Sequence, residues 1–149
     1  MTTAHHLRLI DGMRTEDFPS ERGPSGSGIS GPGYHTALLL SEDDHEDDHA
    51  DGDEADRLEL RAQRLAEHDA LLALLTLRWG EPQLVSLWSA QERMMAGEVI
   101  DEPWAEPVAS CEQLQLWRAD DRWIAVVLYL EEDGPGCELG VVVTVIDPP

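Results

Sequence analysis

A block of negative charge in the first half of the chain limits how this sequence can fold. Residues 41–59 contain eleven acidic residues and one arginine, so they contribute −10 to a total formal charge of −21. Like charges at this density repel one another and stay in water. We therefore predict an acidic tract over residues 41–56 that packs against nothing and ends at a helix, with Asp53 or Asp56 as its N-cap.

The segment after this tract has the pattern of an amphipathic helix. From Leu58 to Trp79, apolar residues recur at spacings of three, four and seven, which predicts a helix of about six turns. Arg78 suits the last turn, Gly80 can adopt a left-handed conformation, and Pro82 cannot continue a helix. The helix is therefore expected to end at Trp79.

The C-terminal third has the pattern of a sheet. Runs of strand character cover residues 112–118, 122–131 and 138–147, and turn residues separate them. They predict a three-stranded antiparallel meander, with residues 34–40 and 83–88 as further candidate strands.

A capping-box pattern at Ser89 and Glu92 predicts a short helix that ends at Gly97. The 98–110 segment, with two prolines, is expected to be a packed loop. The elements together predict an α+β fold, in which one long and one short helix pack on a mainly antiparallel sheet that ends in the meander.

The N-terminal segment is predicted to lie outside this fold. Twelve of the fifteen residues in 19–33 are Gly, Ser or Pro, a composition that buries too little apolar surface to offset the entropy of ordering. Residues 1–18 contain few apolar side chains. We therefore predict a flexible arm and linker over residues 1–33 and a single α+β domain over residues 34–149.

Two short motifs match ligand-binding patterns only in part. Residues 26–31 read GSGISG, but no strand precedes them and a proline follows, so a dinucleotide site is not expected. Asp47, His49 and Asp51 match a calcium loop whose last position is Leu58 instead of a glutamate. We predict neither a cofactor nor a metal.

No catalytic set is visible in the sequence. Cys111 and Cys137 begin the first and third predicted meander strands, about 9.6 Å apart, which is too far for a disulfide. The nearest candidate base for a thiol nucleophile is His68 on the long helix. Two free thiols in a reduced, cytoplasmic protein are the prediction.

The five tryptophans are a large share of the aromatic residues. Trp79, Trp88 and Trp123 are predicted to pack in the core, whereas Trp104 and Trp117 are candidates to contact a partner. With the acidic tract they complete the candidate partner-binding set: Asp43, Asp44, Glu46, Asp47, Asp48, Asp51, Trp104 and Trp117.

The charge also limits the partners. A net charge of −21 repels phosphates and anionic lipids, so we expect no nucleic-acid or membrane partner. We predict a non-enzymatic binding module for a protein, of the immunity, chaperone or regulatory-inhibitor type, and its acidity complements a basic surface. The alternatives are a small enzyme of unknown reaction, an inhibitor that mimics nucleic acid, and a protein whose acidity only serves solubility.

From Trp79 onward, the chain contains RWGEP, SLWS, EPWAEP, QLWRADDRWIAVVLYL and a closing VVVTVIDPP. This succession resembles small acidic uncharacterised proteins of high-GC actinobacteria of the streptomycete type. The resemblance implies no particular activity, cofactor or site residue.

Overall fold

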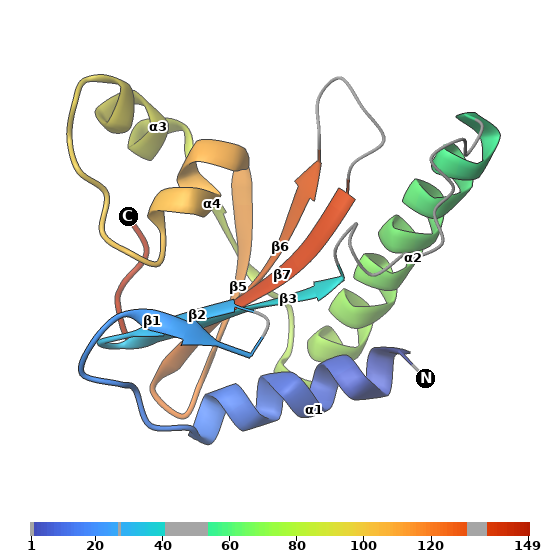
Figure 1. The fold of residues 1–149 in the computed structure, drawn as a ribbon, viewed down its shortest axis with the longest axis horizontal. Helices are drawn as coiled ribbons and strands as arrows, with labels where there is room; N and C mark the ends of the chain where they lie inside the picture. The colour runs from blue at the N-terminus through green and yellow to red at the C-terminus, as the bar shows by residue number, and fades with distance from the viewer. Residues whose placement is uncertain (1, 27, 41–53, 131–136) are drawn as a thin grey trace.

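The computed structural model describes residues 2–26, 28–40, 54–130 and 137–149. They form helices and one open antiparallel sheet of seven strands in the order β1-β2-β3-β7-β6-β5-β4 (Figure 1). The predicted α+β class is confirmed.

The helices are α1 (Thr2–Thr15), α2 (Glu54–Trp79), α3 (Trp88–Met95) and α4 (Ala105–Ser110). The strands are β1 (Gly23–Ser25), β2 (Gly28–Gly31), β3 (Tyr34–Leu40), β4 (Gln83–Ser86), β5 (Gln113–Ala119), β6 (Arg122–Leu130) and β7 (Cys137–Thr144).

Helix α2 follows the prediction closely. Leu71 and Leu75, one turn apart, are fully buried on the side that faces the sheet. The helix ends at Trp79, and Gly80 adopts a φ of 90° while its N–H donates to Thr76 O at 2.8 Å. The start differs in detail, because Asp56 lies inside the helix instead of capping it, and Asp53 is outside the described residues.

Helices cover both faces of the sheet. Ile10 of α1 and Leu71 of α2 pack with Ile124 and other side chains on one face, whereas α3 and α4 pack on the other with Ala125. Neighbouring residues of β6 therefore enter different clusters, since successive side chains of a strand point to opposite faces. The two covered faces explain why β6 is apolar from Trp123 to Leu128.

The predicted meander is confirmed as β5, β6 and β7. Ala119 pairs with Arg122 across a two-residue turn, in which Asp120 and Asp121 have φ values of 54° and 68°. Positive φ at both central residues matches the right-handed twist of the flanking strands. β7 then pairs with β3, so the N-terminal strands extend the same sheet.

The prediction of a flexible arm over residues 1–18 is wrong for α1. Ile10 and Met13 are 0% and 8% exposed and belong to the core cluster beneath α2, with Leu7 packed against them. The three side chains are spaced by three residues and share one helix face. So few apolar residues suffice because α1 docks on an existing core instead of standing alone.

The prediction of a flexible linker over residues 19–33 is wrong for β1 and β2, which pair with each other and with β3. A Cβ atom on Gly28 would lie 2.0 Å from Thr36 O, and one on Gly31 would lie 2.6 Å from the Tyr34 ring. These glycines therefore allow chains to approach closely, a use that composition alone does not distinguish from flexibility.

The predicted short helix exists but starts differently. α3 begins at Trp88 and its N-cap is Leu87, which makes no side-chain capping bond, so the capping box at Ser89 is wrong. Instead, the Ser86 hydroxyl accepts from the Trp88 N–H at 3.3 Å. The expected loop over residues 98–110 contains α4.

One end of the sheet is the attachment point of two acid-rich segments. β3 ends at Leu40, which pairs with Leu139, and β6 ends at Leu130, which pairs with Cys137. Residues 41–53 therefore leave the sheet at the same end at which residues 131–136 connect β6 to β7. Both segments lie outside the described residues.

Candidate functional site

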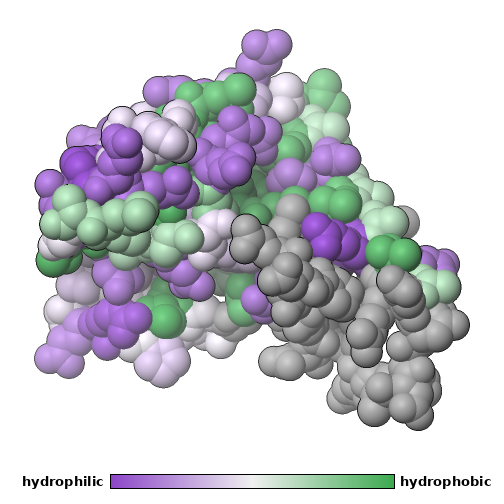
Figure 2. Space-filling model, turned by 90° about the horizontal axis from the view of Figure 1, so that it is seen from above, coloured by the Kyte–Doolittle hydropathy of each residue, from purple (hydrophilic) through white to green (hydrophobic). Residues whose placement is uncertain are grey.

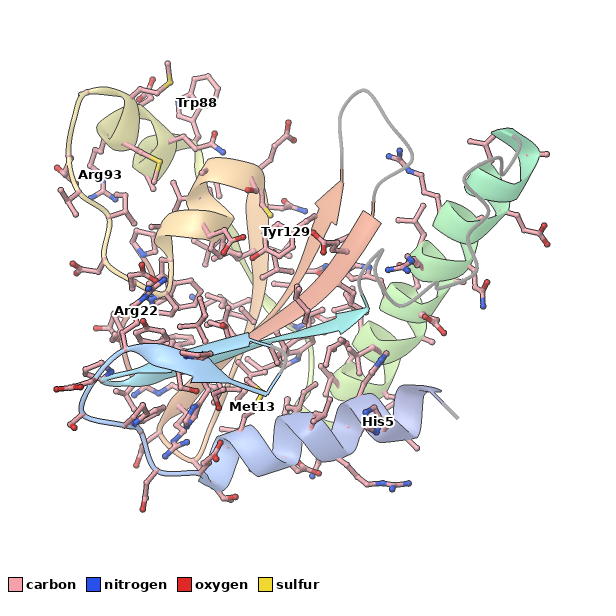
Figure 3. All side chains as sticks on the ribbon, viewed as in Figure 1. His5, Met13, Arg22, Trp88, Arg93 and Tyr129 are labelled. Carbon is pink, nitrogen blue, oxygen red and sulfur yellow. The ribbon has the colours of Figure 1, made fainter. Side chains whose placement is uncertain are left out.

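Helix α3 carries a row of large apolar side chains on its outer side. Trp88 is 67% exposed and Met95 88% exposed, and the Glu92 carboxylate lies between them at spacings of four and three. Ala90 points into the core on the opposite side. Trp88, Glu92 and Met95 are called the α3 face below, and Figure 3 shows the Trp88 ring extending away from the sheet. Trp88 is thus not the core residue that was predicted.

The surroundings of the α3 face are strongly acidic. Residues 81–112, which supply α3, α4 and their connection, contain seven acids and one arginine. That arginine, Arg93, pairs with Glu98 at 3.0 Å. The exposed Val99 lies beside this pair in sequence. Seen from above in Figure 2, hydrophilic and hydrophobic side chains are interspersed over the described residues.

This combination has the properties of a docking surface. Tryptophan and methionine are enriched at the centres of protein interfaces, where a few aromatic anchors contribute most of the binding energy. An acidic rim around them attracts basic partners and repels acidic ones. The α3 face therefore combines an apolar anchor with a charge that selects the partner.

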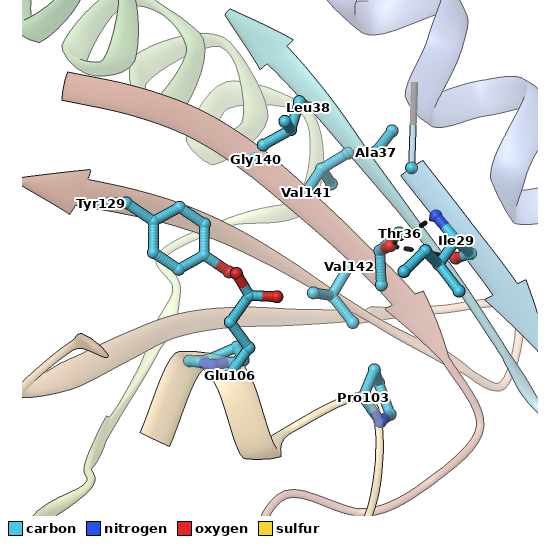
Figure 4. A pocket seen from close by; sticks show the side chains of 12 residues that line it. Ile29, Thr36, Ala37, Leu38, Pro103, Glu106, Tyr129, Gly140, Val141 and Val142 are labelled. Atoms are coloured by element: carbon cyan, nitrogen blue, oxygen red, sulfur yellow. Dashed lines mark hydrogen bonds between the residues drawn. The ribbon is translucent and has the colours of Figure 1, made fainter. Parts of the chain in front are cut away.

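A pocket of about 240 Å³ opens on the same side of the sheet, between α4 and strands β2, β3 and β7, and is called the α4 pocket below (Figure 4). Thr36 Oγ1 both donates to Ile29 O and accepts from Ile29 N–H, at 3.0 Å each. Its hydroxyl is therefore satisfied within the protein. Glu106 and Tyr129 supply the remaining polar side chains of the lining.

Glu106 determines the electrostatics of the α4 pocket. The Tyr129 hydroxyl is directed toward the Glu106 carboxylate in Figure 4. Burial, and then the negative charge of Glu106, raise the pKa of Tyr129. The same two causes raise the pKa of the nearby Cys111 thiol to about 11. The pocket is thus a partly dehydrated, negatively charged environment.

A buried polar cluster that sequence reasoning missed links Ser30, His35 and Glu16. The His35 Nε2–H donates to Glu16 O at 3.2 Å, so Nδ1 accepts from the Ser30 hydroxyl at 2.6 Å. Ser30 and His35 are 4% and 3% exposed. A nucleophile and base are adjacent here, but a substrate has no access to them. The cluster joins the segment after α1 to the β2–β3 hairpin by hydrogen bonds. The Gly-Pro-Gly sequence between the two strands is the signal that could have predicted this hairpin.

The two tryptophans predicted to contact a partner are buried. Trp104 is 1% exposed and its Nε1–H donates to Ile146 O at 3.0 Å; Trp117 is 3% exposed and donates to Gly80 O at 2.9 Å. Each indole therefore joins distant parts of the chain through its polar edge. Neither offers a surface to a partner, which corrects that part of the predicted set.

The six predicted acidic contacts fall outside the described residues. They are Asp43, Asp44, Glu46, Asp47, Asp48 and Asp51. Their role stays a prediction that rests on sequence charge alone.

The candidate thiol–histidine pair is not assembled. Cys111 packs with the cluster beneath α3 and α4, whereas His68 lies on α2, across the sheet. The Cys111 thiol donates to Leu128 O at 3.8 Å. With its raised pKa, this group is a thiol and not a thiolate near neutral pH. The side chain of Cys137 is outside the described residues.

Comparisons of the chain with protein-family models, curated protein sequences and solved structures give no match. Among the helices in the described part of the chain, none is long and apolar enough to cross a membrane. Within the same ranges, no three histidine, cysteine or carboxylate side chains converge as metal ligands would.

Proposed function

We propose that this protein is a non-enzymatic binding module that recognises a basic protein through the α3 face. The observation that carries the proposal is the exposure of the Trp88 side chain, 67%, on a helix whose segment, residues 81–112, has more acids than the pairs of Arg93 with Glu98 and Arg22 with Glu102 neutralise. The indole ring of Trp88 is exposed to water in the free protein. A partner that covered this ring would remove its apolar surface from water, which would favour binding.

The charge supports a basic partner over a second copy of the chain. Two copies at −21 each repel one another, and this repulsion opposes self-association at low salt. A basic protein is attracted by the same field, which accelerates encounter and weakens as salt screens the charges. Binding should therefore become weaker as ionic strength rises.

A module of this kind acts by covering the basic surface of its partner. Immunity proteins, chaperones and regulatory inhibitors share this principle, and the proposal includes all three. It extends to a cytoplasmic location, which a free Cys111 thiol suits. Mimicry of nucleic acid has less support, because it requires acids at fixed spacing and the densest acids lie outside the described residues.

The proposal is tested by capture with matched variants. The immobilised protein is incubated with an extract of the host cell at low salt and then washed at rising salt. The variants are Trp88→Ala and Met95→Ala, and the control is Leu77→Ala, which truncates an 83% exposed side chain on α2. We expect a basic protein that the wild type and the control retain, that salt releases, and that both α3 variants lose.

The result that contradicts the proposal is equally specific. If the α3 variants retain the same proteins as the wild type, or if retention does not depend on salt, the α3 face is not an acidic docking surface. Retention of no protein at low salt contradicts it as well.

A further inference from the structure

We infer that the α4 pocket binds a guanidinium group carried on a short aliphatic chain. This inference goes beyond the proposed function, because the pocket lining contains none of the α3-face residues. It holds whether or not a protein docks on α3.

The size of the α4 pocket limits the ligand. Its volume of about 240 Å³ is below the range of about 300–1,000 Å³ that is typical of pockets for drug-sized molecules. The lining offers aliphatic surface from Ile29, Leu38, Val142 and Pro103. A single chain of a few methylene groups can pack on this surface, whereas a nucleotide would not fit.

Glu106 and Tyr129 indicate the chemistry of the ligand head group. A carboxylate accepts two parallel N–H bonds from a planar guanidinium, and an aromatic ring attracts the same cation to its face. A Cβ atom on Gly140 would lie 3.3 Å from Tyr129 Cε2, so the glycine allows the ring to lie close to β7. Figure 4 shows both polar side chains beside the aliphatic lining.

The charge of the α4 pocket selects a cation. Its lining contains one carboxylate and no basic side chain. The raised pKa values of Cys111 and Tyr129 reflect in part the negative potential of Glu106. A bound cation would offset that potential.

The test is an NMR titration of the ¹⁵N-labelled full chain with three small probes of similar shape: n-butylguanidinium, n-butylammonium and n-butylurea. We expect n-butylguanidinium to bind most tightly, with a Kd on the order of 1 mM. Its largest shifts should fall on backbone amides of lining residues such as Thr36 and Gly140. n-Butylammonium should bind more weakly, because it lacks the planar fork, and the neutral urea should cause no comparable shifts.

Substitution of Glu106 provides the decisive comparison. Glu106→Gln should weaken n-butylguanidinium binding about tenfold, as loss of a charge-assisted bond implies. Glu112→Gln makes the same charge change at an exposed position outside the lining and should leave the Kd unchanged. Because Glu106 is itself exposed, we expect both variants to keep the wild-type Tm.

A fourth probe, N-acetyl-L-arginine amide, distinguishes the two sources of such a cation. Shifts at the same amides support a peptide side chain as the source, and binding of n-butylguanidinium alone supports a free small molecule. Equal shifts with n-butylurea, or an unchanged Kd in Glu106→Gln, would overturn the inference. Neither result depends on the fate of the Trp88 variants.

Discussion

The two sides of the sheet differ in how far their charged side chains are paired. On the α1–α2 side, arginines are part of the packing: Arg14 pairs with Asp11 at 2.9 Å and also with Asp120, and both Arg14 and Arg78 lie over the Trp79 ring. On the α3–α4 side, residues 81–112 contain seven acids and one arginine, and one of these acids, Glu106, lines the α4 pocket. The α1–α2 side is crossed by these ion pairs, whereas on the α3–α4 side acids outnumber the basic side chains that contact them, and the contacts there are Arg93 with Glu98, Arg22 with Glu102 and Arg118 over the Trp123 ring.

This difference separates the parts of the molecule that maintain the fold from those that can meet a ligand. Arginine side chains contribute most where they bridge elements and contact aromatic rings. Acids without such partners contribute little to stability, but they determine which molecules approach. Substitutions on the α1–α2 side should therefore change stability, and those on the α3–α4 side should change binding.

The largest loss of stability is expected where α1 contacts the core. Ile10→Ala should lower the free energy of unfolding by about 2–5 kcal/mol, because it removes a fully buried side chain and leaves a cavity. The control is Leu9→Ala, a neighbour on the same helix that is 36% exposed and should cost about 0.5 kcal/mol or less. Urea denaturation measures both. Equal, small effects would mean that α1 does not contribute to the core.

An intermediate loss of stability is expected for one of two single arginine variants, one from each side of the sheet. Arg122 donates to Met13 O at 2.7 Å and Glu16 O at 2.8 Å, and its guanidinium lies 4.1 Å from the centre of the Phe18 ring. Arg122→Gln should cost about 1–3 kcal/mol. Arg93→Gln, which breaks only an exposed pair with Glu98, should cost about 1 kcal/mol or less. Similar losses in the two denaturation curves would remove the contrast between the sides.

The smallest effect is a pH dependence on the α1–α2 side. Burial lowers the pKa of His6 and of His68 below 6.5 in the folded protein. The unfolded chain therefore takes up protons first, and stability should decline as pH falls through about 6.5. Thermal unfolding between about pH 8 and pH 5 should show a shallower decline for His6→Gln than for His5→Gln, which changes an exposed histidine on the same helix. Parallel profiles would exclude His6 as a source.

The parts of the fold that the sequence predicted correctly have strong local signals. The α2 pattern contains its own periodicity and its own stop at Gly80, and the β5–β6 turn is encoded by adjacent residues. The N-terminal elements lack such signals. α1 packs in one core cluster with Leu71, which is about 60 residues away in sequence. The glycine-rich strands pack closely against Thr36 and Tyr34, and composition does not indicate such close backbone contact.

The candidate site was harder to predict because exposure is a tertiary property. Trp104 lies between two prolines and resembles a loop residue, yet it is buried through a bond to Ile146, 42 residues away. Trp88 follows a strand pattern, but Leu87 occupies the core position and leaves the next side chain in water. The acidic surplus of residues 81–112 was present in the sequence, and only the fold shows that Glu92 shares a helix face with Trp88 and that Glu106 lines a pocket.

The two acid-rich segments are joined to the sheet at one end, and together they contain eleven of the 31 acids of the chain. Both segments begin where β3 and β6 end, whereas β6 begins with Arg122 at the opposite end of the sheet. Productive first collisions with a cationic body should therefore occur at the acid-bearing end, before any short-range contact has formed.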